Sequence, residues 1–171
     1  IPACTVGFLD QAQINGPDTT YRGWGRVALP TSASLGGRVA VSHAVMRINY
    51  SFATSGRQSE FANLQIDLLG SSTTSRVTSS TWDSSSPQAR YDRLGSASVD
   101  VALGGSDLDA VSGSKDIWFG LNSEAAEVLS SGYGTSIFFA FRESPEGTDN
   151  STIGDDTSLV TISSASVTFY Y

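Results

Sequence analysis

The sequence predicts an all-β protein, an antiparallel β-sandwich of jelly-roll kind that forms a single domain over residues 1–171. Hydrophobic residues make up 39% and charged residues 16%, with 17 glycines and many serines and threonines, a composition typical of short strands joined by turns. β-prone stretches recur at intervals of about 10–20 residues, bounded by turn residues and without a strand–helix alternation. The length of 171 residues suits one hydrophobic core.

The densest apolar stretch is residues 135–142, TSIFFAFR, where Ile137 begins a run of five apolar residues. Glycines precede the run and Pro145 follows it. A short aromatic run between turn formers predicts a strand buried on both of its faces. Earlier in the chain, residues 5–9 and 24–29 are also predicted to be strands.

The longest β signal covers residues 38–52. Apolar side chains occupy odd positions at its start and even positions from Ala44 onward. Because strand side chains alternate between two faces, this change of parity predicts a β-bulge or a strand break near Ser42 and His43. Asn49 is then expected on the outward face of the strand, with Val45 and Arg47.

Residues 61–69, FANLQIDLL, alternate between apolar and polar positions. Such alternation predicts an antiparallel strand with one solvated face, on which Asp67 points outward. Further strands are predicted at residues 96–103, 117–121, 159–162 and 166–171. Residues 70–86 are predicted to be a long loop with a short edge strand. One short helix is expected near residues 123–130, with Ser123 as its N-cap.

The charge balance excludes several kinds of partner. The net charge is −7, and Lys115 is the only lysine. An acidic chain does not neutralise a phosphate backbone, so no nucleic acid is expected as a partner, and an anionic membrane surface is also disfavoured. No apolar run approaches the roughly 18 residues of a membrane span. An acidic, serine- and threonine-rich, lysine-poor surface resembles that of secreted proteins, so we expect an extracellular location.

No catalytic residues are predicted. Nucleophilic catalysis requires a nucleophile, a base and an orienting group. The single histidine, His43, lies inside the longest strand, where a hydrogen-bonded strand histidine is the simpler interpretation. The single cysteine, Cys4, is interpreted as a buried or weakly exposed thiol, with an inter-subunit bond or lipid attachment as the alternatives. Asp67 and Asp92 are candidate carboxylates for glycoside hydrolysis, but solvation explains both of them equally well.

Calcium is the one cofactor that the sequence suggests, because it binds six to eight oxygen ligands on flexible loops. Turn formation explains acidic residues in loops equally well, and neither candidate loop has EF-hand spacing. The candidate ligands are Asp107, Asp109 and Asp116 in one loop, and Asp149, Asp155 and Asp156 in another.

Aromatic residues in or beside loops could form a glycan-binding platform, although core packing is the alternative explanation, above all for the tryptophans. These residues are Tyr21, Trp24, Trp82, Tyr91 and Tyr133. Asn49 and Asn150 begin N-glycosylation sequons, which matter only in a host that glycosylates proteins.

Three segments carry a resemblance to a known group of proteins. They are FLDQAQINGPDTTYRGWG (residues 8–25), the pair AVMRINYSF and ANLQIDLLG (residues 44–52 and 62–70), and SLVTISSASVTFYY (residues 158–171). Together they resemble jelly-roll modules of bacterial secreted proteins, some of them grouped with carbohydrate-binding modules. The resemblance implies an extracellular β-sandwich and no particular ligand. The aromatic C-terminal alternation is also similar to that of chaperone–usher pilins, although pilins usually carry a disulfide.

Two functions remain open at this point. The first is a non-enzymatic structural subunit that assembles with copies of itself into a fibre, matrix or shell, through strand edges or through the β-prone terminal segments 5–9 and 166–171. The second is a carbohydrate-binding module that holds a polysaccharide on its loop aromatics. A viral coat protein, which can also be a jelly roll, is a further option.

Overall fold

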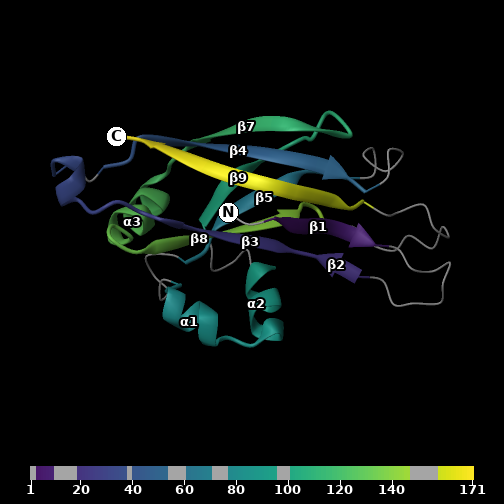
Figure 1. Cartoon of the computed structure of the whole chain (residues 1–171), viewed down its shortest axis with the longest axis horizontal. Coiled ribbons are helices and arrows are strands. Elements are labelled where there is room, and N and C mark those ends of the chain that lie inside the picture. The colour runs from purple at the N-terminus through teal and green to yellow at the C-terminus, as the bar shows by residue number, and fades with distance from the viewer. Residues whose placement is uncertain are drawn as a thin grey trace.

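The computed structural model describes residues 3–9, 19–37, 40–53, 61–70, 77–95, 101–146 and 158–171. Two antiparallel β-sheets pack face to face, which confirms the predicted all-β sandwich (Figure 1). The strands are β1 (Cys4–Leu9), β2 (Thr19–Tyr21), β3 (Gly23–Ala28), β4 (His43–Phe52), β5 (Leu64–Leu68), β6 (Val101–Ser106), β7 (Ser112–Gly120), β8 (Ser136–Glu143) and β9 (Val160–Tyr170). The helices are α1 (Ser79–Ser84), α2 (Pro87–Leu94) and α3 (Ser123–Ser131), with a short 3-10 helix at Ala33–Leu35.

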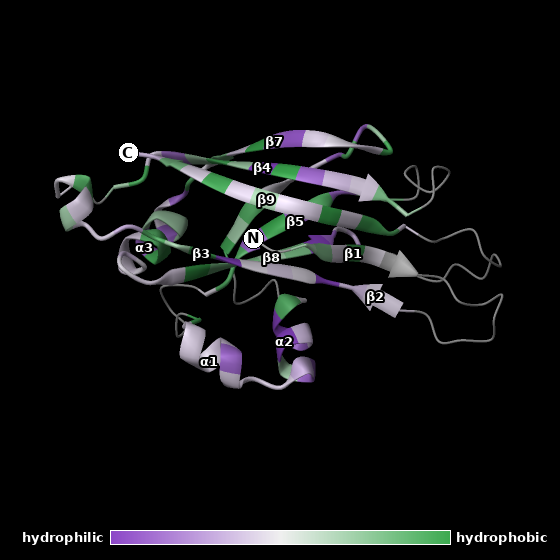
Figure 2. Cartoon of the chain, in the orientation of Figure 1, coloured by the Kyte–Doolittle hydropathy of each residue, from purple (hydrophilic) through white to green (hydrophobic). Residues whose placement is uncertain are grey.

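The first sheet has the strand order β2-β1-β9-β4-β7, so the long strand β4 lies between β9 and β7. Hydrophobic and hydrophilic residues alternate along β4 and β9 (Figure 2). From Met46 onward, the even positions of β4 are buried, whereas Arg47 and Asn49 are exposed. One face of this sheet therefore meets the core and the other meets solvent. Arg47 and Asn49 face outward as predicted, whereas Val45, which was expected beside them, is buried.

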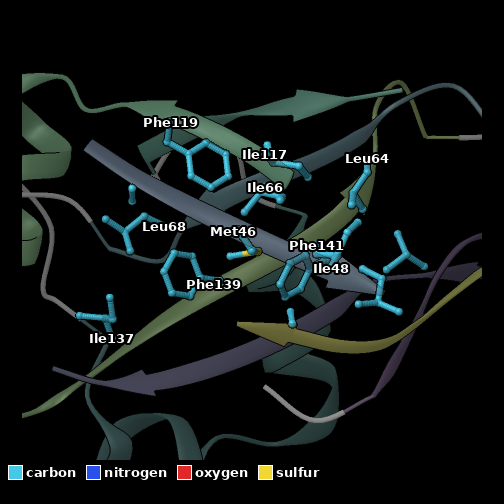
Figure 3. Close-up of a cluster of buried hydrophobic side chains, with 14 of the residues drawn as sticks. Met46, Ile48, Leu64, Ile66, Leu68, Ile117, Phe119, Ile137, Phe139 and Phe141 are labelled. Carbon is cyan, nitrogen blue, oxygen red and sulfur yellow. The ribbon is translucent and has the colours of Figure 1, made fainter. Parts of the chain in front are cut away.

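The second sheet has the order β3-β8-β5-β6 and supplies the other half of the core. Figure 3 shows the two sheets meeting, with Met46 and Phe119 on one side and Ile66, Phe139 and Phe141 on the other. All five of these side chains are at most 2% exposed. This packing is the main apolar burial of the molecule, and burial of this kind is the dominant favourable term in folding.

The segment with the highest aromatic content behaves as predicted. Residues 137–141 of β8 are all buried, so this strand is covered on both faces. One face contributes to the core between the sheets. On the other, Phe138 and Ala140 form a second buried cluster with Leu69, Trp82 and Leu94. Because Trp82 and Leu94 come from α1 and α2, these two helices cover the outer side of the second sheet (Figure 1).

The structure contains two helices that were not predicted, α1 and α2, which precede the predicted helix α3. The predicted loop at residues 70–86 contains α1, whose N-cap Thr78 forms a capping box with Thr81. Ser86 caps α2, and Pro87 occupies the first turn of that helix. Neither helix has an apolar stripe strong enough to reveal it by periodicity, since Trp82 and Leu94 are their only buried residues.

The third helix confirms the one helix that was predicted, although its N-cap is Asn122 instead of Ser123. The Asn122 Oδ1 accepts a hydrogen bond from the Ala125 backbone N–H at 2.8 Å. Ala125, Val128 and Leu129 are the buried side chains of this helix. Among the described residues, no helix is long and apolar enough to cross a membrane.

Other boundaries also differ from prediction. The parity change near Ser42 is a strand break, because β4 begins at His43, and a register irregularity between β4 and β9 lies at Asn49 and Tyr50. The strand β7 begins at Ser112, five residues before the predicted strand. In place of the strand predicted at residues 96–103, the structure has β6 at Val101–Ser106, and residues 96–100 lie outside the described ones. A single strand, β9, replaces the two predicted C-terminal strands.

Candidate functional site

The outer face of the first sheet presents an ordered array of side chains from three adjacent strands. Each outward residue of β4 has a partner on both β7 and β9, so the array forms rows across the sheet. From one end, the rows are His43, Gly120 and Tyr170; Val45, Trp118 and Thr168; Arg47, Asp116 and Ser166; and Asn49, Ser114 and Ser164. We call this array the outer face.

Three aromatic rings gather at one end of the outer face. The His43 and Tyr170 rings stack with centroids 4.4 Å apart and planes inclined by 6°. The Trp118 ring lies 5.7 Å from His43 and 6.2 Å from Tyr170, at 21° and 18°. We call these three residues the aromatic patch. Gly120, opposite His43, has no side chain, and no atom lies within 4 Å of the position that a Cβ would take there.

The aromatic patch is unusually open for its residue types. The Trp118 side chain is 65% exposed and Tyr170 is 42% exposed. A tryptophan normally contributes to a core or an interface because its ring offers a large apolar area. Contiguous exposed apolar side chains rimmed by polar groups are typical of binding surfaces.

The start of β4 is held so that the His43 ring keeps its position. The backbone N–H of Ser42 donates to the Tyr170 carbonyl at 2.7 Å, and the Ser42 hydroxyl donates to the same oxygen at 3.0 Å. That hydroxyl also lies 3.0 Å from His43 Nδ1. When its one proton is donated to the Tyr170 carbonyl, Ser42 Oγ can only accept a hydrogen bond from Nδ1–H of His43.

The next part of the outer face is an ion pair. The Arg47 guanidinium donates from Nε and Nη2 to the two carboxylate oxygens of Asp116, both at 2.6 Å. These hydrogen bonds lower the pKa of the Asp116 carboxyl below its ordinary value and raise the pKa of Arg47. A bidentate pair of this kind fixes the orientation of both groups, and its two charges cancel locally.

A hydrogen-bonded triad follows the ion pair along the sheet. The Asn49 amide donates from Nδ2 to Ser164 Oγ at 2.7 Å and accepts at Oδ1 from the Ser114 hydroxyl. Asn49 lies six positions after His43, which is about 20 Å along a strand. The outer face is therefore a strip about 20 Å long and about 10 Å wide, since neighbouring strands lie about 4.8 Å apart.

Trp24 and Trp82, two of the predicted glycan-binding residues, pack together: Trp82 is buried in the second cluster, and Trp24 is partly buried against it. Their ring centroids are 5.1 Å apart, and both rings contact Phe138. Trp82 is only 2% exposed, so its ring faces are occupied by protein. Core packing, the alternative explanation, describes this pair.

The three predicted tyrosines lie elsewhere. The Arg22 guanidinium lies 4.3 Å from the centre of the Tyr91 ring, and it also forms a salt bridge with Glu146. Tyr21 ends the edge strand β2 and is half-buried, whereas Tyr133 lies beside Tyr171 with centroids 6.4 Å apart. The aromatic patch contains none of the five predicted residues.

A sequence signal for the aromatic patch does exist. Ile117 and Phe119 both point into the core, so the residue between them must point outward. The same rule places His43 on the outward face of β4, because the next residue, Ala44, is buried on the inward face. Which other strands bring their outward residues next to these two cannot be read from alternation.

Of the six predicted calcium ligands, two pair with cations, one is exposed and three lie outside the described residues. Asp109 accepts a hydrogen bond from Lys115 Nζ at 2.7 Å, and Asp116 pairs with Arg47. Asp107 is exposed, and Asp149, Asp155 and Asp156 fall outside the described ranges. Within those ranges, no group of three or more histidine, cysteine, aspartate or glutamate side chains could hold a metal ion.

The remaining candidate residues are the two carboxylates, the cysteine and the two sequon asparagines. Asp67 points outward from β5 as predicted, but it is buried, so the prediction of a solvated face for this strand was wrong. Arg142 pairs with Asp67 at 3.0 Å. Asp92 accepts a hydrogen bond from Gln88 at 2.8 Å within α2. Burial raises the pKa of the Cys4 thiol to about 11, as expected for a thiol that stays protonated. Of the two sequons, Asn49 is on the outer face and Asn150 lies outside the described residues.

A shallow cavity of about 300 Å³ lies between α1 and α2. Its lining includes Trp82 and Arg90, and Arg90 donates to the carbonyls of Trp82 and Asp83, each at 2.9 Å. The arginine thus closes the C-terminal end of α1, so its hydrogen bonds serve helix packing.

The outer face is the surface on which exposed aromatic rings and oriented polar groups occur together. It contains a cluster of stacked aromatic rings in which Trp118 is the most exposed, a charge-neutral ion pair and a set of hydroxyl and amide groups, all on paired strands. Comparisons of the chain with protein-family models, with curated proteins and with solved structures found no match.

Proposed function

We propose that this protein is a non-enzymatic, secreted carbohydrate-binding module that holds a glycan on its outer face. The observation that carries the proposal is the aromatic patch, in which the rings of Trp118, His43 and Tyr170 are nearly parallel and Trp118 and Tyr170 are exposed to solvent. A sugar ring has an apolar C–H face and a rim of hydroxyl groups. An aromatic ring can pack against the C–H face while neighbouring polar side chains bind the hydroxyl groups. Ligand sites commonly combine apolar contacts with a few polar groups in this way.

The polar rows support the same proposal. Asn49 is already hydrogen-bonded to both Ser114 and Ser164, so the three side chains are oriented before a ligand arrives. Serine hydroxyls and an asparagine amide each combine donor and acceptor capacity, which matches the hydroxyl groups of a sugar. Pre-oriented groups lose less conformational entropy on binding than mobile ones.

We also propose that the sandwich is a jelly roll. The strand pairs β1·β9, β3·β8, β4·β7 and β5·β6 are nested one inside the next along the chain. Nesting of this kind follows when one long antiparallel hairpin wraps around a single core. Eight strands in two sheets are typical of jelly rolls, which occur in lectin domains as well as in viral coats.

Self-assembly is the second candidate function, and the edge strand β7 is the observation that favours it. In the described sheet β7 pairs with β4 alone, so its other side is open to a strand from a second copy. The terminal strands are less suited to exchange, because β1 and β9 each lie between two neighbours in the same sheet. Assembly would therefore use the β7 edge.

Binding to insoluble polysaccharides tests the first proposal. Wild-type protein should be depleted from solution by at least one of a panel of neutral and acidic polysaccharides. Trp118→Ala should weaken that binding roughly tenfold or more, which corresponds to about 1.4 kcal/mol. Tyr171→Ala is the matched control, since Tyr171 is an exposed aromatic residue outside the aromatic patch.

Unchanged binding by Trp118→Ala would overturn the glycan proposal.

Light scattering after size-exclusion chromatography tests assembly on the same preparations. Oligomers that disappear in Ser112→Lys, which adds a charge to the β7 edge, would support self-assembly. A protein that stays monomeric at all concentrations would exclude it.

A further inference from the structure

We infer that the glycan held by the outer face is a neutral, linear polysaccharide that lies along β4, with one part on the aromatic patch and another on the Asn49 triad. This inference rests on the proposed glycan-binding function and specifies its ligand. Two observations lead to it: the cancellation of charge on the outer face, and the alignment of the aromatic patch with the polar rows.

Charge cancellation favours a neutral ligand. Among the described residues of β4, β7 and β9, the basic side chains are Arg47, Lys115 and His43. Arg47 donates to both oxygens of Asp116, and Lys115 pairs with Asp109 at 2.7 Å. An acidic sugar is normally held by an arginine or lysine that has no competing carboxylate. Here a carboxylate already occupies the guanidinium, and it would repel a second one.

The net charge of the whole chain also favours a neutral ligand. With a net charge of −7, the protein repels a polyanion at distances within the Debye length, about 10 Å at moderate salt. The other side chains of the outer face in these rows are uncharged: Val45, Asn49, Ser114, Ser164, Ser166 and Thr168. Hydroxyl groups of a neutral sugar match this surface, and carboxylate or sulfate groups do not.

The arrangement of the rows favours an extended chain. The aromatic patch lies at the start of β4, the Arg47–Asp116 pair lies two rows further on, and the Asn49 triad lies one row beyond the pair. One or two sugar units cannot cover a strip about 20 Å long, whereas several units of a linear polymer can. The polymer would then run parallel to the strands, over the ion pair.

Soluble polymers of known charge test the first part of this inference. Calorimetry at about pH 8, above the usual titration range of histidine, compares unbranched neutral glucans, mannans and xylans with alginate and polygalacturonate. We expect binding to a neutral polymer, weakened roughly tenfold by Trp118→Ala and unaffected by Tyr171→Ala. Asp116→Asn, which leaves Arg47 without its carboxylate, should create measurable binding to the acidic polymers at low salt.

The outcomes separate the two levels of the proposal. Acidic-polymer binding by the wild type that Trp118→Ala removes would overturn the inference of a neutral ligand and leave glycan binding intact. No binding to any neutral or acidic polymer would overturn the glycan proposal itself.

A length series of the bound oligosaccharide tests the second part. Affinity should rise with length until the chain spans the strip, and Asn49→Ala should weaken long oligosaccharides several-fold more than short ones. Equal effects of Asn49→Ala on long and short ligands would overturn the proposed path along β4. Circular dichroism of each variant confirms that the sheet is retained.

Discussion

Arg142 Nε donates to Asp67 Oδ2 at 3.0 Å, in a position where the aspartate side chain is only 3% exposed. A second donor, Gln65 Nε2, reaches the other carboxylate oxygen of Asp67 at 2.9 Å. The three residues lie on the outer side of β5 and β8, on the side of the second sheet that α1 and α2 cover. Asp67 thus points away from the core between the sheets and is nevertheless buried.

Removal of one partner of this pair should be strongly destabilising. Asp67→Ala leaves the largely buried Arg142 guanidinium without its carboxylate partner. Such a change typically lowers the free energy of unfolding by about 3–5 kcal/mol. Urea denaturation measures the loss. The double variant Asp67→Leu/Arg142→Leu is the matched comparison, and it should recover most of the stability because both charges are gone. A loss below about 1 kcal/mol in Asp67→Ala would contradict the role of the pair.

Gly7→Ala should impair folding severely. Gly7 has a φ of +120°, and a Cβ at this position would lie 1.9 Å from the Ser158 carbonyl oxygen. Backbone strain and the steric clash together should cost about 3 kcal/mol or more. Gly120→Ala is the control, since no atom lies within 4 Å of its Cβ position, and it should change stability by less than about 1 kcal/mol. Thermal unfolding of both variants tests the contrast.

Stability should fall at alkaline pH because of Cys4. Burial raises the pKa of the folded thiol from 9.0 to about 11. As the pH rises from about 9 to about 11, the unfolded chain loses this proton while the folded chain keeps it, so unfolding becomes more favourable. The Cys4 contribution should reach about 3 kcal/mol at the upper end. Chemical denaturation of the wild type and of Cys4→Ala over this pH range should show a steeper decline in the wild type.

The difference between the wild type and Cys4→Ala is the informative quantity, because any other group that loses a proton in this pH range is present in both proteins. Burial, together with a hydrogen bond to Tyr171, raises the pKa of Tyr133 to about 12, and this contribution is common to both. Parallel pH profiles of the wild type and Cys4→Ala would contradict the burial of the thiol.

The N-cap of α3 provides a local test. Asn122→Ala removes the acceptor that bonds the Ala125 N–H at 2.8 Å, and the loss should be about 1 kcal/mol. Ser123→Ala alters the neighbouring residue, which the sequence suggested as the cap, and should have a much smaller effect. Denaturation midpoints of the two variants decide between the two caps. A larger effect at Ser123 would show that the helix begins one residue later.

Several properties of this protein follow from its sequence alone. The alternation of apolar residues identifies most of the strands and the inward residues of β4, because strand geometry is local. The run at residues 137–141 predicted a strand covered on both faces, and β8 is such a strand. The helices α1 and α2 escaped prediction because caps and tertiary packing, more than an apolar stripe, hold short helices in place.

The candidate site is different, because only the tertiary structure decided it. His43, Trp118 and Tyr170 come from β4, β7 and β9, and the Asn49–Ser164 hydrogen bond joins residues 115 positions apart. Alternation determines which side of a strand each residue takes, whereas strand order and register determine its neighbours. Those depend on the burial of the whole core and on the closure of long loops, which no local pattern encodes.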